Sequence, residues 1–249
     1  MVAAMTWNEL VDALFGTAHD VVCEADLLHG TADFDGSPIA VVGTANHAEI
    51  GVELALAQAR VVLDTIREHR GRPLLLLVDT HGQRLRRRDE LLHIARAMAH
   101  LGKSLALARR LGHPLVGLVY DQALSGGFIT SGLMADDCHA LEHAEIRVMR
   151  LPAMARVTKI DEARLAELAE SNPVFAPGVR NYLAMGGVKS LWQGDGAALR
   201  DHLRQALAQR SLEDVRAADG AARGGRRLAA AVARDVVEEG MRSAPRLAA

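Results

Sequence analysis

The stretch that decides the fold runs from residue 71 to residue 141: GRPLLLLVDTHGQRLRRRDELLHIARAMAHLGKSLALARRLGHPLVGLVYDQALSGGFITSGLMADDCHAL. Its two apolar runs, Leu74–Asp79 and Leu115–Tyr120, have no polar face, which is typical of strands in a sheet covered by helices on both sides. Residues 89–111 between them have a helical period. The stretch therefore predicts a right-handed βαβ unit with parallel strands.

Each of the two predicted strands ends in a loop of small and polar residues. Asp79-Thr80-His81-Gly82-Gln83 follows the first strand, and Ser125-Gly126-Gly127-Phe128 follows the second and opens a helix. Glycine allows close approach of a backbone, and a helix start leaves N–H groups without partners. We expect neighbouring loops that offer N–H groups to an oxyanion. A plain glycine turn and a solvated loop histidine remain the alternative.

The flanking sequence extends the same pattern. Residues 6–16 predict an amphipathic helix and residues 39–43 a short core strand. A long helix is expected from Asn46, with Asn46 as N-cap and Glu49 at the capping-box position. Further helices alternate with short strands towards the C-terminus, which predicts an α/β fold. We expect one domain over residues 1–215, followed by a Gly/Arg-rich link and a terminal helix over residues 216–249.

The composition excludes several classes of protein. The 29 basic and 31 acidic residues nearly balance, and only 3% of residues are aromatic, so neither a nucleic-acid surface nor base-stacking platforms are expected. We find no signal-peptide pattern and no run of ~18 apolar residues that a membrane helix needs. Cys23 and Cys138 lack a CxxC or metal-like spacing and are expected to be free thiols. These features predict a cytoplasmic protein.

Familiar catalytic motifs are missing from the sequence. It has no GxGxxG, GxSxG or HExxH pattern, its eleven histidines are scattered, and no Ser–His–Asp triad can be assembled. We therefore expect no metal site. A dense run of arginines could hold a phosphate or the acidic face of a partner, or could be solvated and paired with nearby acids: Arg84, Arg86, Arg87 and Arg88.

Five stretches, in this order, resemble the γ subunits of biotin-independent malonate decarboxylases. They are DGSPIAVVGTANHAEIGVE (35–53), LLVDTHGQRLRRRDELL (76–92), SGGFITSGLMAD (125–136), IRVMRLPAMARVTKI (146–160) and NPVFAPG (172–178). The resemblance covers about residues 8–210. The α-type half of biotin-dependent carboxyltransferases is a wider relative, with DTPG-like and SGGA-like loops. This chain differs from that half at His81 and Phe128, and residues 121–124 replace its glycine-rich lead-in.

The resemblance implies a crotonase (ClpP-like) fold, with stacked βαβ units and a mostly parallel sheet flanked by helices. It also implies that the chain works with a β subunit, as a heterodimer or heterotetramer. The pair would decarboxylate a malonyl thioester to acetyl thioester and CO₂ through an enolate held by backbone N–H groups at the subunit interface. An acyl-carrier protein would carry the substrate on a CoA-like prosthetic group, and a transferase subunit would load it. No biotin and no cofactor bound by this chain are expected.

The same resemblance implies roles for individual residues. The oxyanion hole would be formed by Gly82, Gln83, Gly127 and Phe128. Substrate contacts would come from His81, Ser125, Gly126, Met154, Ala155 and Arg156. Two other functions stay open, namely one half of a biotin-dependent carboxyltransferase and a non-catalytic crotonase-like scaffold that binds the β subunit and the carrier protein.

Overall fold

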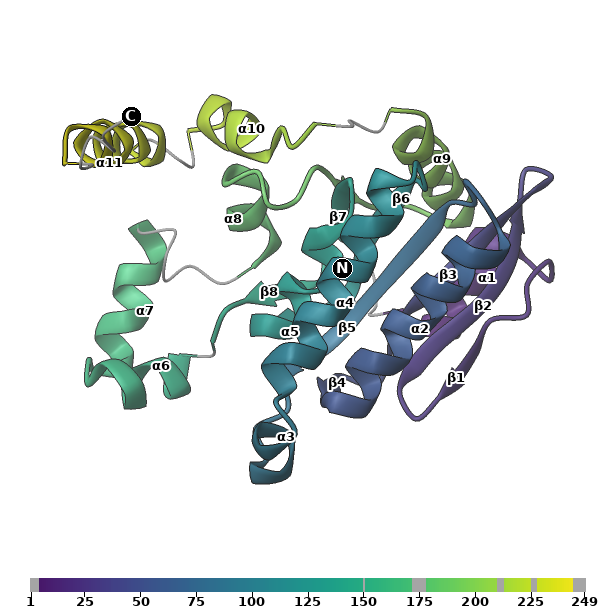
Figure 1. Cartoon of the computed structure of the whole chain (residues 1–249), viewed down its shortest axis with the longest axis horizontal. Coiled ribbons are helices and arrows are strands. Elements are labelled where there is room, and N and C mark those ends of the chain that lie inside the picture. The colour runs from purple at the N-terminus through teal and green to yellow at the C-terminus, as the bar shows by residue number, and fades with distance from the viewer. Residues whose placement is uncertain (1–4, 150, 172–177, 210–212, 225–227, 244–249) are drawn as a thin grey trace, which may run out of the picture.

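A single sheet organises the structure, a computed structural model that describes residues 5–149, 151–171, 178–209, 213–224 and 228–243. The strand order is β1-β2-β3-β5-β6-β7-β9, with β4 paired to β5 and β8 paired to β6 (Figure 1). The strands are β1 Val22–Glu24, β2 Leu27–Phe34, β3 Ser37–Thr44, β4 Ala48–Ile50, β5 Leu74–Gln83, β6 Leu115–Leu124, β7 Asp137–Leu141, β8 Glu145–Arg147 and β9 Leu191–Trp192.

Helices cover both faces of this sheet. They are α1 Trp7–Phe15, α2 Val52–Glu68, α3 Arg87–Leu91, α4 Ile94–Arg110, α5 Ser125–Ile129, α6 Leu151–Thr158, α7 Glu162–Ser171, α8 Val179–Ala184, α9 Gly196–Ala208, α10 Arg216–Ala222 and α11 Ala229–Ser243. Strands β3, β5, β6, β7 and β9 are parallel neighbours, and β1, β2 and β3 pair antiparallel. The predicted α/β architecture and the βαβ unit β5-α4-β6 are confirmed.

The two central strands have the alternation that a doubly covered sheet requires. Leu74 and Leu76 of β5 lie in the core cluster that contains residues of α2 and α4. Leu75 and Leu77 lie in the cluster formed with α1 and α9. A fully buried leucine side chain contributes roughly 1.5–3 kcal/mol to folding. Burial on both faces explains why this run is apolar at every position.

Strands β5 and β6 are longer than the sequence predicts, and each serves two sets of partners. Residues 74–77 of β5 pair with β3, whereas Thr80–Gln83 pair with β4 after a register shift. The first half of β6 pairs with β7, and Gln122–Leu124 pair with β8. The register between β5 and β6 also shifts after Val78. Bulges of this kind redirect a strand, and here they bring both predicted loops to one edge.

The helix predicted from Asn46 begins later than expected. Asn46 is left-handed, with φ of 57°, and the N-cap of α2 is Gly51. Residues 48–50 form β4 instead, because alternate residues Ala48 and Ile50 are buried beside β5. The predicted helix over residues 89–111 is likewise interrupted at His93, whose φ is 57°, and divides into α3 and α4.

The C-terminal segment contacts the rest of the chain through an arginine. Arg223 donates hydrogen bonds to the carbonyls of Leu183, Val188 and Lys189, at 2.7, 3.0 and 3.1 Å. Residues 213–224 therefore lie against the earlier part of the fold, and the division at residues 215 and 216 stays a prediction. In the part of the chain that the structure describes, every helix is too short or too polar to cross a bilayer.

Candidate functional site

The predicted loop over residues 79–83 is in fact the end of strand β5, and residues 125–128 open helix α5 directly after β6. These two segments touch through their glycines. A Cβ at Gly82, where φ is 95°, would lie 2.9 Å from the carbonyl oxygen of Leu124. A Cβ at Gly127 would lie 2.8 Å from Thr80 Oγ1 and 3.1 Å from Gly82 Cα. Real Cβ contacts are not this short, so both positions require glycine. The expected juxtaposition of the two loops is confirmed.

The hydroxyl of Thr80 organises the first loop. The side chain is 1% exposed, donates to the carbonyl of Ala48 at 2.7 Å and accepts the N–H of Gly82 at 2.9 Å. The N–H of Gly82, which was predicted to donate to an oxyanion, therefore donates to Thr80 in this structure. In this conformation Gly82 shapes the loop, and the backbone N–H groups in the first turn of α5 are the donors that face no intrahelical acceptor.

Ser125 begins α5 in a conformation unusual for a non-glycine residue. Its φ is 50°, in the left-handed region, which costs about 1–2 kcal/mol for a residue with a Cβ. The Ser125 hydroxyl donates to the carbonyl of Val148 and thereby ties the loop to the segment after β8. Its hydroxyl therefore positions the backbone. Strain of this kind gathers at functional sites.

A cavity of about 510 Å³ lies over the two loops. Four of the predicted site residues line it, together with five that were not predicted: His81, Gln83, Ser125 and Gly126, with Leu85, Leu124, Val148, Met149 and Ala153. The wall is mostly apolar, and the polar groups are few. This composition is typical of a pocket for a small molecule.

The remaining predicted residues do not line this cavity. The Phe128 side chain is buried in the core, with its ring edge-on to Tyr182 at a centroid distance of 6.0 Å. On α6, Met154 and Ala155 are half-buried and Arg156 is exposed, whereas Ala153 reaches the cavity wall. The reason is helical geometry, since residues 151–158 form a helix and only one side of it can face the cavity.

The arginines beside the first loop are mostly exposed. Arg88 forms an ion pair with Glu53, and Arg84 lies 3.8 Å from Glu49, so their partners belong to α2 and β4. Asp89, an acid next to this run, accepts the N–H of Val52 at 3.0 Å. Whether these arginines bind a phosphate or a partner protein, or are simply solvated, stays open.

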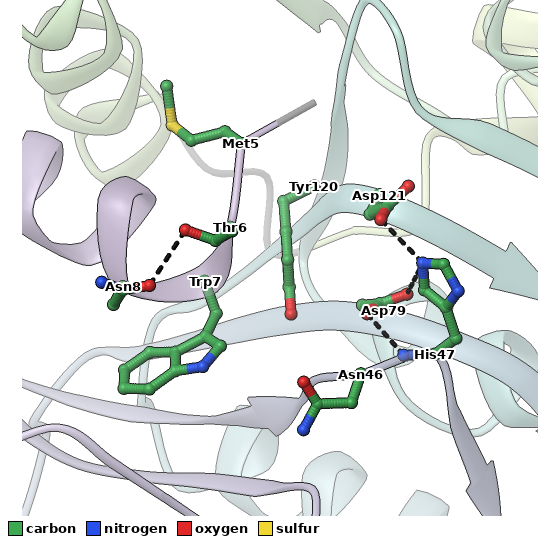
Figure 2. Close-up of a pocket in the computed structure, with 9 residues that line it drawn as sticks. All are labelled: Met5, Thr6, Trp7, Asn8, Asn46, His47, Asp79, Tyr120 and Asp121. Carbon is green, nitrogen blue, oxygen red and sulfur yellow. Dashed lines mark hydrogen bonds and ion pairs between the residues drawn. The ribbon is translucent and has the colours of Figure 1, made fainter. Parts of the chain in front are cut away.

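Beyond His81 lies a group that the sequence analysis missed. The imidazoles of His81 and His47 are 5.1 Å apart, and His47 Nε2 lies 2.8 Å from Asp121 Oδ2 and 3.8 Å from Asp79 Oδ1 (Figure 2). A second cavity, of about 400 Å³, opens beside His47, Asp79 and Asp121. His47 is 32 residues from Asp79 and 74 from Asp121, so no local spacing could have revealed the group.

Burial sets the electrostatics of this group. Asp79 is 2% exposed, and burial raises the pKa of its carboxyl above the ordinary value, partly offset by the backbone and ring of His47 and the backbone of Gln122. Tyr120 lies beside it, and burial raises the pKa of the Tyr120 hydroxyl, which donates to the carbonyl of Thr44 at 3.0 Å.

Comparison with known proteins places this arrangement in a family. The family model for the malonate decarboxylase gamma subunit matches residues 45–240. The malonyl-S-ACP:biotin-protein carboxyltransferase MADD of Malonomonas rubra is 38% identical over 151 residues, which cover 57% of this chain and 52% of MADD. The chain thus spans about half the length of this curated relative.

Solved structures agree in fold. A Pseudomonas malonate decarboxylase hetero-tetramer in complex with coenzyme A has a chain that is 29% identical at a TM-score of 0.74, with 92% of this chain and 96% of that chain covered. The Pseudomonas MdcD–MdcE hetero-dimer gives 30% identity, a TM-score of 0.73 and the same coverage.

A transcarboxylase 12S chain, 21% identical, matches at a TM-score of 0.67 over 82% of this chain and 41% of its own length. This likeness to a carboxyltransferase concerns the fold alone, and together with the Pseudomonas match it confirms the predicted α/β fold with a mostly parallel sheet. Two matches establish more than the fold. The family model covers most of the chain, and the MdcD–MdcE match covers nearly all of it. The chain belongs to the malonate decarboxylase gamma-subunit family.

Proposed function

We propose that the cavity over the β5 and β6 loops is this chain's half of a decarboxylation site shared with a β subunit. The pair would convert a malonyl thioester into an acetyl thioester and CO₂. The observation that carries this proposal is the contact between two glycine loops, Gly82 and Gly127, beneath a cavity lined by His81 and Gly126. Two backbone segments so arranged suit the recognition of an oxygen anion.

The chemistry needs such a site. When the bond from the α-carbon to the carboxylate breaks, its electron pair moves into the thioester and leaves an enolate, which then takes a proton at carbon. A preorganised N–H donor lowers the barrier to an oxyanion by roughly 3–4 kcal/mol. The first-turn amides of α5 are the proposed donors on this chain. Gln83 and His81 would contact the substrate from the opposite wall, although the Gln83 amide donates to Glu90 at 3.2 Å.

The rim of the cavity supports a protein partner. Leu85 is 85% exposed and Val148 58% exposed, and both line the cavity. Leu91 of α3 is a further apolar side chain exposed on the same segment as Leu85. Apolar side chains around a polar pocket are typical of a surface that a partner covers. We propose that the β subunit covers it and brings the other half of the site.

The substrate would arrive on a carrier. We propose that an acyl-carrier protein presents the thioester on a CoA-like prosthetic group and that a transferase subunit loads it, without biotin. The name of MADD, a malonyl-S-ACP carboxyltransferase, and the coenzyme A complex of the Pseudomonas enzyme support a thioester of this type. A cytoplasmic location agrees with the free thiols of Cys23 and Cys138.

One observation favours a second candidate function. MADD transfers a carboxyl group to a biotin protein, according to its name, and it is 38% identical to the matched part of this chain. The same enolate would form, but the carboxyl group would pass to biotin. Product analysis separates the two functions, since free CO₂ forms without biotin only in the decarboxylase.

The proposed site is tested by filling it. A Cβ at Gly126 would lie 3.3 Å from Met98 Cε, the flexible end of a side chain, so Gly126→Ala should fold. Gly126→Val places two more carbon atoms beside the cavity wall. Gly102→Ala on α4 is the matched control, because nothing lies within 4 Å of its added Cβ.

Each variant would be co-purified with the β subunit and assayed for CO₂ release from malonyl-CoA. We expect turnover to fall in the order Gly, Ala, Val at position 126, by at least about tenfold for Val, and to be unchanged in the control. Full turnover of Gly126→Val in an intact β/γ complex would remove this loop from the site. That result would favour the scaffold function.

A further inference from the structure

Three side chains outside the proposed decarboxylation site converge on one point. His47 Nε2, Asp79 Oδ1 and Asp121 Oδ2 offer one ligand atom each, and these atoms all lie within 4.8 Å of one another. Figure 2 shows them facing one another beside Tyr120. Asp79 and Asp121 come from the neighbouring strands β5 and β6, and His47 comes from the connection between β3 and β4.

The fold holds these groups in place. Asp79 Oδ2 accepts the backbone N–H of His47 at 2.7 Å, which fixes both residues. Asn46 and His47 are consecutive left-handed residues, with φ of 57° and 53°. Each non-glycine residue in that conformation costs of order 1–3 kcal/mol and persists only where its surroundings demand it. Here the hydrogen bond from the His47 backbone to Asp79 holds this conformation, and the His47 ring is directed at the two carboxylates.

One ligand atom of the group is buried and accepts no hydrogen bond within normal distance. Asp79 is 2% exposed, and its Oδ1 makes no hydrogen bond in the described structure, with His47 Nε2 at 3.8 Å as its contact. A buried carboxylate oxygen without a donor costs free energy. Asp79 also lines the 400 Å³ cavity, so a species in that cavity can reach this oxygen.

The charges around the cavity do not balance. Two carboxylates share one imidazole, and among the described residues that line the cavity none is a lysine or an arginine: Met5, Thr6, Trp7, Asn8, Asn46, His47, Asp79, Tyr120 and Asp121. With both carboxylates ionised, the group carries two negative charges when His47 is neutral and one when His47 is protonated. A bound cation would balance this charge and give the buried oxygen of Asp79 a ligand.

The geometry points to a binding site for a divalent transition-metal ion held by His47, Asp79 and Asp121. One imidazole nitrogen and two carboxylate oxygens suit Zn²⁺ or Mn²⁺, whose bonds to such ligands are about 2.0–2.2 Å long. Ligand atoms around such an ion are roughly 3–3.6 Å apart by these bond lengths. The separations of 2.8 and 3.8 Å from His47 Nε2 bracket that range, and the two carboxylate oxygens lie within 4.8 Å of each other. The open side faces the cavity.

This site shares no lining residue with the cavity of the proposed decarboxylation site. The His47 ring is 5.1 Å from that of His81, which lines the larger cavity, so an ion here would steady the loop that bears His81. The role is structural support of the loop. The competing explanation is a plain hydrogen bond between His47 and Asp121 with no ion.

Zinc binding to the full-length chain decides between these explanations. The chain would be stripped with a chelator, dialysed and titrated with ZnCl₂ in a calorimeter at neutral pH, and its thermal unfolding would be followed with and without Zn²⁺. Asp121→Asn keeps the size of the side chain and an acceptor for His47, and Asp121 is partly exposed, so the variant should fold. His47→Gln removes the nitrogen ligand.

Two matched controls remove similar groups nearby. Asp26→Asn alters a carboxylate that accepts from Asn46 at 2.9 Å, and His29→Gln alters an imidazole that lies 3.5 Å from Glu24. We expect one Zn²⁺ per chain and a higher unfolding temperature in wild type and both controls. Affinity should fall at least about tenfold in Asp121→Asn and His47→Gln.

Two results would overturn the site. One is a wild-type chain that takes up no Zn²⁺ and gains no thermal stability from it. The other is binding that is equally strong in Asp121→Asn, His47→Gln and the controls, which would place the ion elsewhere. Neither result depends on turnover, so the decarboxylation proposal stands or falls separately.

Discussion

Replacing Thr80 with valine removes one hydroxyl from beneath the candidate site and keeps the shape of the side chain. In the structure that hydroxyl donates to the carbonyl of Ala48 at 2.7 Å and accepts the N–H of Gly82 at 2.9 Å. The side chain is 1% exposed, so water cannot replace it without rearrangement. Thr80→Val therefore leaves the N–H of Gly82 without its acceptor at the point where the two loops touch.

The expected loss follows from these two bonds. An unsatisfied buried polar group costs about 1–3 kcal/mol, and two groups lose their partner, so Thr80→Val should lower the free energy of unfolding by about 2–6 kcal/mol. Thr65→Val is a matched control with the same chemical change. Thr65 is also buried, but its hydroxyl donates to Val61 O, a carbonyl within helix α2 that has a helical partner already. Its loss should cost less than about 1 kcal/mol.

Urea unfolding of the two variants measures this difference as a shift in midpoint at constant slope. The kcat/KM of the β/γ complex for malonyl-CoA should fall at least about tenfold in Thr80→Val, because the Gly82 loop loses its anchor. Thr80→Ser, which restores the hydroxyl, should recover most of both losses. Equal destabilisation of Thr80→Val and Thr65→Val, or full turnover in Thr80→Val, would refute this reasoning.

Three further predictions concern other parts of the chain. Ser125→Gly should be about 1 kcal/mol more stable in urea than Ser125→Ala, because both lose the hydroxyl and only alanine keeps the left-handed strain; equal stability would contradict the strain. Burial lowers the pKa of His139 to about 3, below its ordinary 6.5, so stability is complete above pH 6.5 and falls as the pH drops below it. His139→Phe, which keeps the ring contact with Trp192, should reduce the stability lost between pH 7 and pH 5 by about 2 kcal/mol; an unchanged loss would exclude His139 as its source. Arg223→Ala should speed amide hydrogen exchange across residues 216–222, since three carbonyl contacts disappear; unaltered exchange would show that other contacts hold α10.

The sequence predicts the central part of the fold well because its apolar runs carry a clear signal. Leu74–Leu77 are buried on alternate faces, so the run is apolar throughout and indicates a central parallel strand. The β4 strand was missed for a related reason. Ala48 and Ile50 alternate as a strand requires, but they also fit the helical period of the residues that follow. The strand is favoured over the helix because residues 48–50 pair with the extended end of β5, and this pairing cannot be read from the local sequence.

The candidate site was predicted in part. The glycines could be identified because close backbone approach restricts the residue type, and the structure shows that Gly82 and Gly127 have no room for a Cβ. On α6 it is Ala153 that lines the cavity, since the direction of a helix face depends on how the helix packs, and the substrate contacts of Met154, Ala155 and Arg156 stay predictions. The group of His47, Asp79 and Asp121 was invisible, because the fold unites residues from three separate segments.

The central claim is that this chain and a β subunit share one decarboxylation site, and the most direct measurement compares β alone, the γ chain alone and the β/γ complex. Each would be incubated with malonyl-CoA without biotin, and CO₂ and acetyl-CoA would be quantified. We predict equal amounts of both products from the complex, with no turnover by the γ chain alone and a large loss of turnover by β alone. Turnover by β alone at the rate of the complex, or CO₂ release that requires a biotin protein, would contradict the account.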